Sequence, residues 1–148
     1  MTGAVRLGVV LLCHDDLGLV ARLARVWADG GARVAIHVDA KVSGARVARL
    51  RQALECDRIV FSKRHRCSWG RFSLVRATQD AASELLARFP DTTHVYLASG
   101  ACLPLRPISE LTAYLAADPQ RDVEAQRARR GRLDLGHRVV AAELHDRA

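Results

Sequence analysis

The longest uninterrupted apolar run of the chain, residues 7–13, constrains its fold more than any other feature. Valine and leucine dominate residues 5–12, and polar residues do not alternate with them as they do in a strand that has one solvated face. Such a run is typical of a strand buried on both faces, and strands of this kind occur mainly in parallel sheets. The sequence therefore predicts a parallel sheet that begins near the start of the chain.

The next segment has the spacing of a crossover helix. Apolar residues recur every three or four positions over residues 17–28, and Asp29-Gly30-Gly31 ends the pattern as a helix stop. A second strand is expected over residues 33–38. Strand, helix and strand in this order form a βαβ unit with parallel strands.

The same alternation continues as far as residue 120. We expect helices over residues 44–54 and 72–89, strands over 58–61 and 94–98, and a further helix that begins at Pro107. The predicted fold class is α/β, a mostly parallel, Rossmann-like sheet with flanking helices. Ligands of such open sheets bind beyond the carboxyl ends of the strands, so the loops that follow the strands are the candidate site.

The composition changes after residue 120. Residues 121–148 are rich in arginine, and only residues 138–144 resemble a strand. We therefore divide the chain into an α/β domain, residues 1–120, and an arginine-rich tail, residues 121–148, which is expected to be a weak helix or disordered.

The net charge of +7 favours an anionic ligand. Nucleic-acid binding requires clustered basic residues, whereas most arginines here are dispersed over the predicted helices, where a solvated face explains them. The one cluster in a loop consists of Lys63, Arg64, Arg66 and Arg71. We expect no nucleic-acid partner.

Cysteine usage and hydropathy bear on the compartment. The four cysteines form no CxxC pair and are expected to be reduced thiols. No apolar run approaches the roughly 18 to 20 residues that cross a bilayer, and no secretory leader is recognisable. We expect a cytoplasmic protein whose membrane association, if any, is peripheral, at the inner membrane.

Asp39 and Lys41 follow the second predicted strand. A carboxylate at this place can accept hydrogen bonds from a ribose hydroxyl or a base N–H group; the alternative is an Asp39 that caps the next helix or pairs with Lys41. The first strand-to-helix turn reads CHDDLG instead of GxGxxG, which disfavours a dinucleotide-binding fold.

Polar groups also follow the third predicted strand. Ser62 and Arg64 offer donors for a nucleotide, and the Arg64 guanidinium can fork onto phosphate, although a solvated basic loop is the alternative. Trp69 and Gly70 precede the long helix, and Trp69 is either a packing anchor or the wall of a sugar site.

Metal-assisted and hydrolytic chemistry are both disfavoured. The chain has no DxD sequence, so a hard cation would lack its oxygen ligands, and we expect no metal and no cofactor. Ser99 has no GxSxG frame, which argues against an α/β-hydrolase. Isolated histidines such as His37 and His94 are interpreted as structural, and His14 alone is kept as a candidate.

Four motifs occur in order: VVLLCH, IHVDAK, SWGRFSLV and HVYLASGACLPL. Together they resemble glycosyltransferase family 14, the core-2/I-branching β-1,6-N-acetylglucosaminyltransferases and the related peptide O-xylosyltransferases. The resemblance covers residues 5–115. It implies a GT-A-like fold and inverting, metal-independent transfer from UDP-N-acetylglucosamine or UDP-xylose to a hydroxyl of a glycan or protein acceptor.

The resemblance also implies site residues. The nucleotide contacts fall on Cys13, His14, Asp39, Ser62 and Arg64. The residues that line the cleft are Lys41, Trp69, Gly70, Ser99, Gly100 and Cys102.

Two departures from the family pattern affect the expected activity. Cys102 stands where family members commonly carry an acidic residue. The family's catalytic base and its diphosphate-binding basic residues belong to a C-terminal half that residues 121–148 do not resemble, so we expect an incomplete, truncated or frameshifted chain with weak or no turnover. The alternatives are a non-catalytic UDP-binding or interaction module and, third, a basic nucleic-acid-binding protein.

Overall fold

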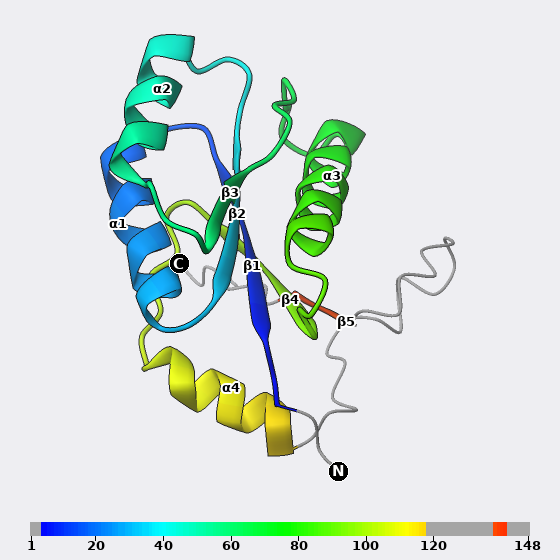
Figure 1. Ribbon diagram of the computed structural model, residues 1–148. Coiled ribbons are helices and arrows are strands. Elements are labelled where there is room, and N and C mark those ends of the chain that lie inside the picture. The colour runs from blue at the N-terminus through cyan, green and yellow to red at the C-terminus, as the bar shows by residue number, and fades with distance from the viewer. Residues whose placement is uncertain (1–3, 118–137, 142–148) are drawn as a thin grey trace, which may run out of the picture.

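The computed structural model describes residues 4–117 and 138–141. Within these residues the chain forms a five-stranded parallel sheet in the order β3-β2-β1-β4-β5, with helices on both faces (Figure 1). The strands are β1 (Leu7–Cys13), β2 (Arg33–Val38), β3 (Ile59–Phe61), β4 (His94–Ser99) and β5 (Arg138–Ala141). The helices are α1 (Leu17–Asp29), α2 (Gly44–Ala53), α3 (Phe72–Arg88) and α4 (Ile108–Ala117). The predicted α/β class and parallel sheet are confirmed.

β1 lies at the centre of the described sheet because its apolar run supplies both faces. It pairs in parallel with β2 on one side and with β4 on the other. Leu7, Val9 and Leu11 belong to the core cluster under α1, α2 and α4, whereas Val10 belongs to the cluster under α3. The alternation of β1 side chains between the two clusters explains why the run has no polar positions.

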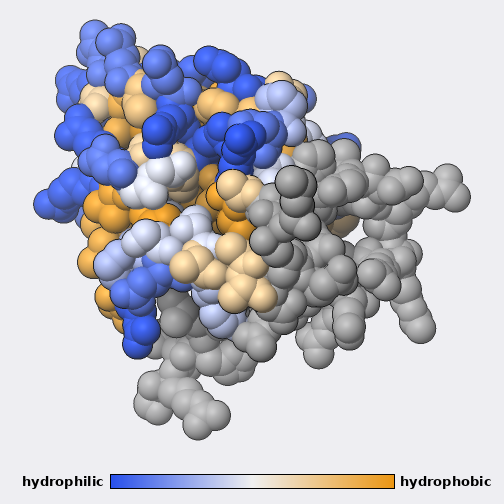
Figure 2. All heavy atoms as spheres, turned by 60° about the horizontal axis from the view of Figure 1, so that its bottom comes forward, coloured by the Kyte–Doolittle hydropathy of each residue, from blue (hydrophilic) through white to orange (hydrophobic). Residues whose placement is uncertain are grey.

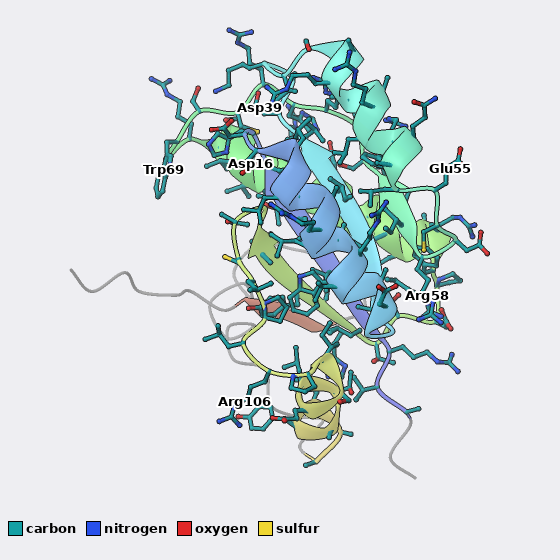
Figure 3. The ribbon with its side chains drawn as sticks, turned by 90° about the vertical axis from the view of Figure 1, so that its left-hand side faces the viewer. Asp16, Asp39, Glu55, Arg58, Trp69 and Arg106 are labelled. Atoms are coloured by element: carbon teal, nitrogen blue, oxygen red, sulfur yellow. The ribbon has the colours of Figure 1, made fainter. Side chains whose placement is uncertain are left out.

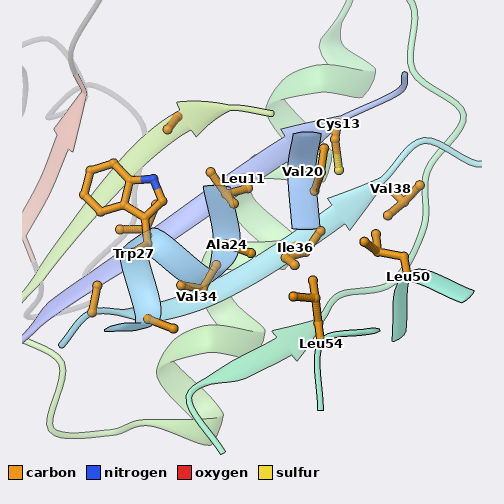
Figure 4. Close-up of a cluster of buried hydrophobic side chains, with 14 of the residues drawn as sticks. Leu11, Cys13, Val20, Ala24, Trp27, Val34, Ile36, Val38, Leu50 and Leu54 are labelled. Atoms are coloured by element: carbon orange, nitrogen blue, oxygen red, sulfur yellow. The ribbon is translucent and has the colours of Figure 1, made fainter. Parts of the chain in front are cut away.

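The larger of the two core clusters lies between the sheet and α1 (Figure 4). Val20, Ala24 and Trp27 repeat at helical spacing along α1 and are buried. Asp16 begins this helix, since its carboxylate accepts a hydrogen bond from the Leu19 amide at 3.0 Å. Gly31, at φ 96°, turns the chain into β2, a conformation that glycine adopts without strain.

α3 packs against the opposite face of the sheet, where β1 carries a glycine. A Cβ atom at Gly8 would lie 2.7 Å from Leu85 Cδ2 and 2.9 Å from Thr92 Cγ2. Leu85 itself is fully buried. The absent side chain therefore allows α3 to approach the middle of the sheet closely.

β5 corrects one expectation. It pairs in parallel with β4, with His94 opposite Arg138 and Leu97 opposite Ala141. The strand signal at residues 138–144 is thus confirmed at Arg138–Ala141, and a weak helix or disordered tail is wrong for these four residues. The rest of residues 121–148 lies outside the described part of the chain.

The strand order changes direction at β1, because β2 and β3 lie on one side of it and β4 on the other (Figure 1). Such a switch point is where open parallel sheets bind ligands, beyond the carboxyl ends of the strands. The loops after β1, β2, β3 and β4 therefore form the edge of the sheet at which a site is expected.

The surface seen from the α4 end of the molecule is mixed in character. Hydrophobic residues interrupt hydrophilic ones on this face (Figure 2). The large hydrophobic side chains that the described residues expose include Leu103, Leu105 and Tyr114. None of the described helices is both long enough and apolar enough to cross a membrane.

Candidate functional site

Backbone hydrogen bonds gather the loops that follow four strands. The Asp39 amide donates to the Cys13 carbonyl at 2.8 Å, and the Gly100 amide donates to the Leu12 carbonyl at 2.8 Å. The Ser62 amide donates to the Ile36 carbonyl at 3.0 Å. The predicted site residues that follow different strands therefore meet at one edge of the sheet, and Asp16, Asp39 and Trp69 lie at the same end of the molecule in Figure 3.

Asp39 is only 3% exposed, and both of its carboxylate oxygens accept hydrogen bonds. Oδ1 accepts a hydrogen bond from the Lys41 amide at 2.8 Å, and Oδ2 accepts one from the Cys67 amide at 3.2 Å. The Lys41 ammonium lies 3.6 Å from Oδ2. The structure therefore contains the Asp39–Lys41 ion pair, which was one of the alternatives to a ligand contact.

These contacts keep Asp39 ionised. Desolvation by burial opposes ionisation, but the amide hydrogen bonds from Lys41 and Cys67, followed by the charge of Lys41, outweigh it and lower the pKa of the carboxyl group below its ordinary value. The negative charge joins the loop after β2 to the loop after β3.

Arg64, in the loop after β3, joins the same two loops because its side chain donates to backbone carbonyls at the end of β2 and in the loop after it. Its Nε donates to the Val38 carbonyl at 3.3 Å, and its Nη2 donates to the Asp39 carbonyl at 3.0 Å and to the Val42 carbonyl. Among the described residues, no hydrogen-bond partner lies at Nη1. The guanidinium thus clamps the loop after β2 and keeps one nitrogen for another acceptor.

The side chains of Cys13 and Ser62 are buried. The Cys13 thiol donates to the His37 carbonyl at 3.0 Å, and burial raises the pKa of this thiol to about 12. The Ser62 hydroxyl donates to the Lys63 carbonyl at 3.3 Å. Both side chains therefore make internal contacts at the strand ends.

Other candidates are open to solvent. His14 is exposed, and the Lys41 side chain is 49% exposed while its Nζ donates to the Cys67 carbonyl at 2.8 Å. Trp69 is 95% exposed, so its interpretation as a packing anchor is wrong. Gly70 follows it at φ 67°, which explains a glycine at this turn.

The loop after β4 closes over the end of β1. The Ser99 hydroxyl accepts a hydrogen bond from the Ala101 amide at 3.1 Å, and the Cys102 thiol lies 3.5 Å from the same oxygen. A Cβ atom at Gly100 would lie 2.7 Å from Cys13 Cβ and 2.9 Å from Val20 Cγ2. Glycine is therefore needed for this loop to reach β1.

Sequence reasoning missed three residues that organise this edge. The Cys67 backbone contacts both Asp39 and Lys41. The His65 amide donates to His37 Nε2 at 2.9 Å, and the His65 ring Nε2 lies 2.7 Å from the Asp80 carboxylate. No local motif marks these contacts, because β2, the loop after β3 and α3 come together only in the folded chain.

The described residues contain no group of three His, Cys, Asp or Glu side chains placed to hold a metal ion. Lys41 and Arg64 offer basic donors at this edge, which suit a phosphate-bearing ligand, and the exposed Asp15 and Asp16 follow β1 at the same edge. The absence of a metal from the reaction stays a prediction.

Comparison with protein families agrees with this fold. The family model described as Core-2/I-Branching enzyme matches residues 9–142, a span that includes β5 and extends past residue 115, where the resemblance of the motifs ends. No curated protein matches the chain. The matched span begins within β1 and includes the other four described strands and the loops of the candidate edge, and the chain therefore belongs to the Core-2/I-Branching enzyme family of glycosyltransferases.

Proposed function

We propose that the carboxyl edge of the sheet binds the nucleotide of a UDP-sugar, and that the protein serves inverting, metal-independent transfer of N-acetylglucosamine or xylose to an acceptor hydroxyl. The proposal rests on two reciprocal contacts between the loops after β2 and β3, beside the switch point. The Asp39 carboxylate accepts a hydrogen bond from the Cys67 amide, and the Arg64 guanidinium donates one to the Asp39 carbonyl. Family membership supports the glycosyl-transfer chemistry.

Within this proposal the site residues divide by accessibility. Asp39, Ser62 and Cys13 are buried, so their assigned role is to hold the strand ends and loops in position. His14, Lys41 and Arg64 Nη1 are the groups that reach the ligand directly. Asp39 accepts a ribose or base donor only where its loop opens to admit the nucleotide.

The accessible cations explain how the diphosphate is held without a metal. The Lys41 ammonium and the Arg64 guanidinium are held by hydrogen bonds to backbone carbonyls, so they are already oriented when UDP leaves the sugar. Preorganised positive groups stabilise a developing negative charge at little cost in reorganisation. We assign them this role in place of a divalent cation.

Trp69 is assigned to the sugar side of the site. Its loop is fixed to Asp39 through the Cys67 amide, two residues before the indole. A solvent-exposed aromatic face beside a nucleotide site suits the apolar face of a sugar ring. Gly70, Ser99, Gly100 and Cys102 complete the proposed lining.

The reaction also requires a general base. A carboxylate would deprotonate the acceptor hydroxyl as it attacks the anomeric carbon. The Asp39 carboxylate is occupied by two amides and an ammonium group, so we do not assign it this role. A chain that binds UDP without transferring sugar is the second candidate function.

Calorimetric titration with UDP tests the binding site. Arg64→Ala removes the clamp and the free Nη1, and Asp39→Ala removes the carboxylate, so both variants should lose measurable binding. Arg49→Ala, on the exposed face of α2, is the matched control and should bind UDP as the native chain does. Unchanged affinity in Arg64→Ala would refute the site assignment.

Transferase assays with UDP-N-acetylglucosamine and with UDP-xylose, each with and without a chelator, separate the two candidate functions. Release of UDP that depends on acceptor and resists the chelator supports the metal-independent transferase. UDP binding without turnover for either donor supports the non-catalytic module.

A further inference from the structure

His65 joins three elements at the proposed donor edge. Its backbone amide donates to His37 Nε2 on β2 at 2.9 Å, and its carbonyl accepts from the Ala40 amide at 2.9 Å. Its ring Nε2 lies 2.7 Å from Asp80 Oδ2 on α3. One residue therefore fixes the loop after β3 to β2, to the loop after β2 and to α3.

The first of these contacts requires a neutral His37. An imidazole nitrogen accepts a hydrogen bond only when it carries no proton. The His37 side chain is buried and its ring stacks on that of His65, with centroids 5.9 Å apart and planes at 21°. The ring is thus enclosed, and Nε2 has the His65 amide as its partner.

The surroundings favour the neutral ring. Desolvation by burial is the largest effect that lowers the pKa of His37, and the charges of His65 and Arg64 lower it further, whereas the charge of Asp39 acts in the opposite direction. α3 contributes Asp80, which contacts His65, and Glu84, which accepts from the Lys63 amide at 2.9 Å.

With a proton on Nε2, the His37 ring N–H and the His65 amide N–H would face each other with no acceptor between them. The partly buried His65 amide would lose its acceptor, and an N–H group that is shielded from water and has no acceptor is costly. The same short loop carries the Arg64 guanidinium and the Cys67 amide, which hold the loop after β2. Loss of the contact between the His65 amide and His37 therefore weakens the attachment of the loop after β3 to the loop after β2.

We propose that His37 and His65 are positioning residues of the donor site, which hold the Arg64 loop against the Asp39 loop only while the His37 ring is neutral. Acidification then releases the loop and weakens donor binding. The effect on the donor rests on the proposed function, whereas the effect on the loop does not.

Nuclear magnetic resonance tests the loop directly. The amides of His65 and Cys67 are followed from about pH 8 to about pH 4, beyond the ordinary histidine range because the pKa of His37 is lowered. The measured quantity is the hydrogen-exchange rate of each amide, divided by its intrinsic rate at the same pH. Both amides should lose protection from exchange as the His37 ring takes up its proton. Amides that stay protected while His37 protonates would overturn the proposal.

His37→Gln supplies the matched variant, because a side-chain amide oxygen can accept from the His65 amide at every pH. The variant should keep the loop protected over the whole range. The same pH dependence in His37→Gln as in the native chain would count against the proposal, and if the variant does not fold, the amides of the native chain decide alone.

Calorimetry with UDP over the same range tests the consequence. The affinity of the native chain should fall about tenfold per pH unit once His37 is mostly protonated, because the fraction of binding-competent protein falls by that factor. His37→Gln should lack this fall, and protonation of UDP affects both proteins alike. Failure of the native chain to bind UDP at any pH would refute the proposed function, while the amide measurement still decides the role of His37.

Discussion

At the scale of single residues, the candidate edge depends on a few positions at which no other residue type makes the same contacts. Asp39 is one, because two amides and an ammonium group converge on its carboxylate. Gly100 is another, because a side chain there would meet Cys13 and Val20. Each position yields a prediction that native and substituted chains can test.

Asp39→Asn should destabilise the fold by about 1–3 kcal/mol, since an amide side chain offers one acceptor oxygen where two amides require acceptors. The native carboxyl group has a lowered pKa, so its contribution is present above the unfolded value of about 3.9 and is lost as the pH falls through the lower folded value. Urea denaturation at several pH values should show this acid loss in the native chain and a smaller one in the variant. Identical pH profiles would contradict the role given to Asp39.

Gly100→Ala should destabilise the fold by about 1–3 kcal/mol, because the added methyl group overpacks the contact with β1. Gly44→Ala is the control: a Cβ atom at Gly44, in the first position of α2, meets nothing within 4 Å. The control should leave the fold equally stable or stabilise it by up to about 1 kcal/mol. Equal effects of the two substitutions in urea denaturation would show that the close approach of Gly100 is not needed.

At the scale of elements, the contact between β1 and α3 depends on complementary sizes. Gly8 leaves room for Leu85, so Gly8→Ala should destabilise the fold by about 1–3 kcal/mol through overpacking. Leu85→Ala creates space at the same contact, so the penalty of the alanine at position 8 should become smaller in the double variant, while the close approach to Thr92 Cγ2 remains. A double-mutant cycle by urea denaturation measures this coupling, and additive effects would show that α3 does not touch β1 at Gly8.

At the scale of the whole molecule, β5 extends the sheet beyond β4. Val139 lies opposite Val95 in this pairing. Val139→Pro removes a backbone N–H group from the strand and should weaken the pairing. Hydrogen exchange should then quicken in β4 while β2 and β3 keep their native rates; unchanged exchange in β4 would contradict the pairing.

Several parts of this architecture followed from local pattern. The apolar run of residues 7–13 predicted β1 as a buried strand, and the spacing of Leu17, Val20, Ala24 and Trp27 predicted α1. β5 was harder to assign, because four residues of strand propensity within an arginine-rich segment become a strand only through pairing with β4.

The sequence by itself determined the α/β alternation, the parallel sheet and the loops that follow its strands, because hydrophobic periodicity and turn residues act over a few positions. Only the tertiary structure decided what the residues in those loops do. Asp39 became a buried link between loops, Trp69 an exposed ring, and His37 the acceptor of a loop amide. These outcomes depend on contacts between residues far apart in the chain, which exist only once the sheet has brought the loops together.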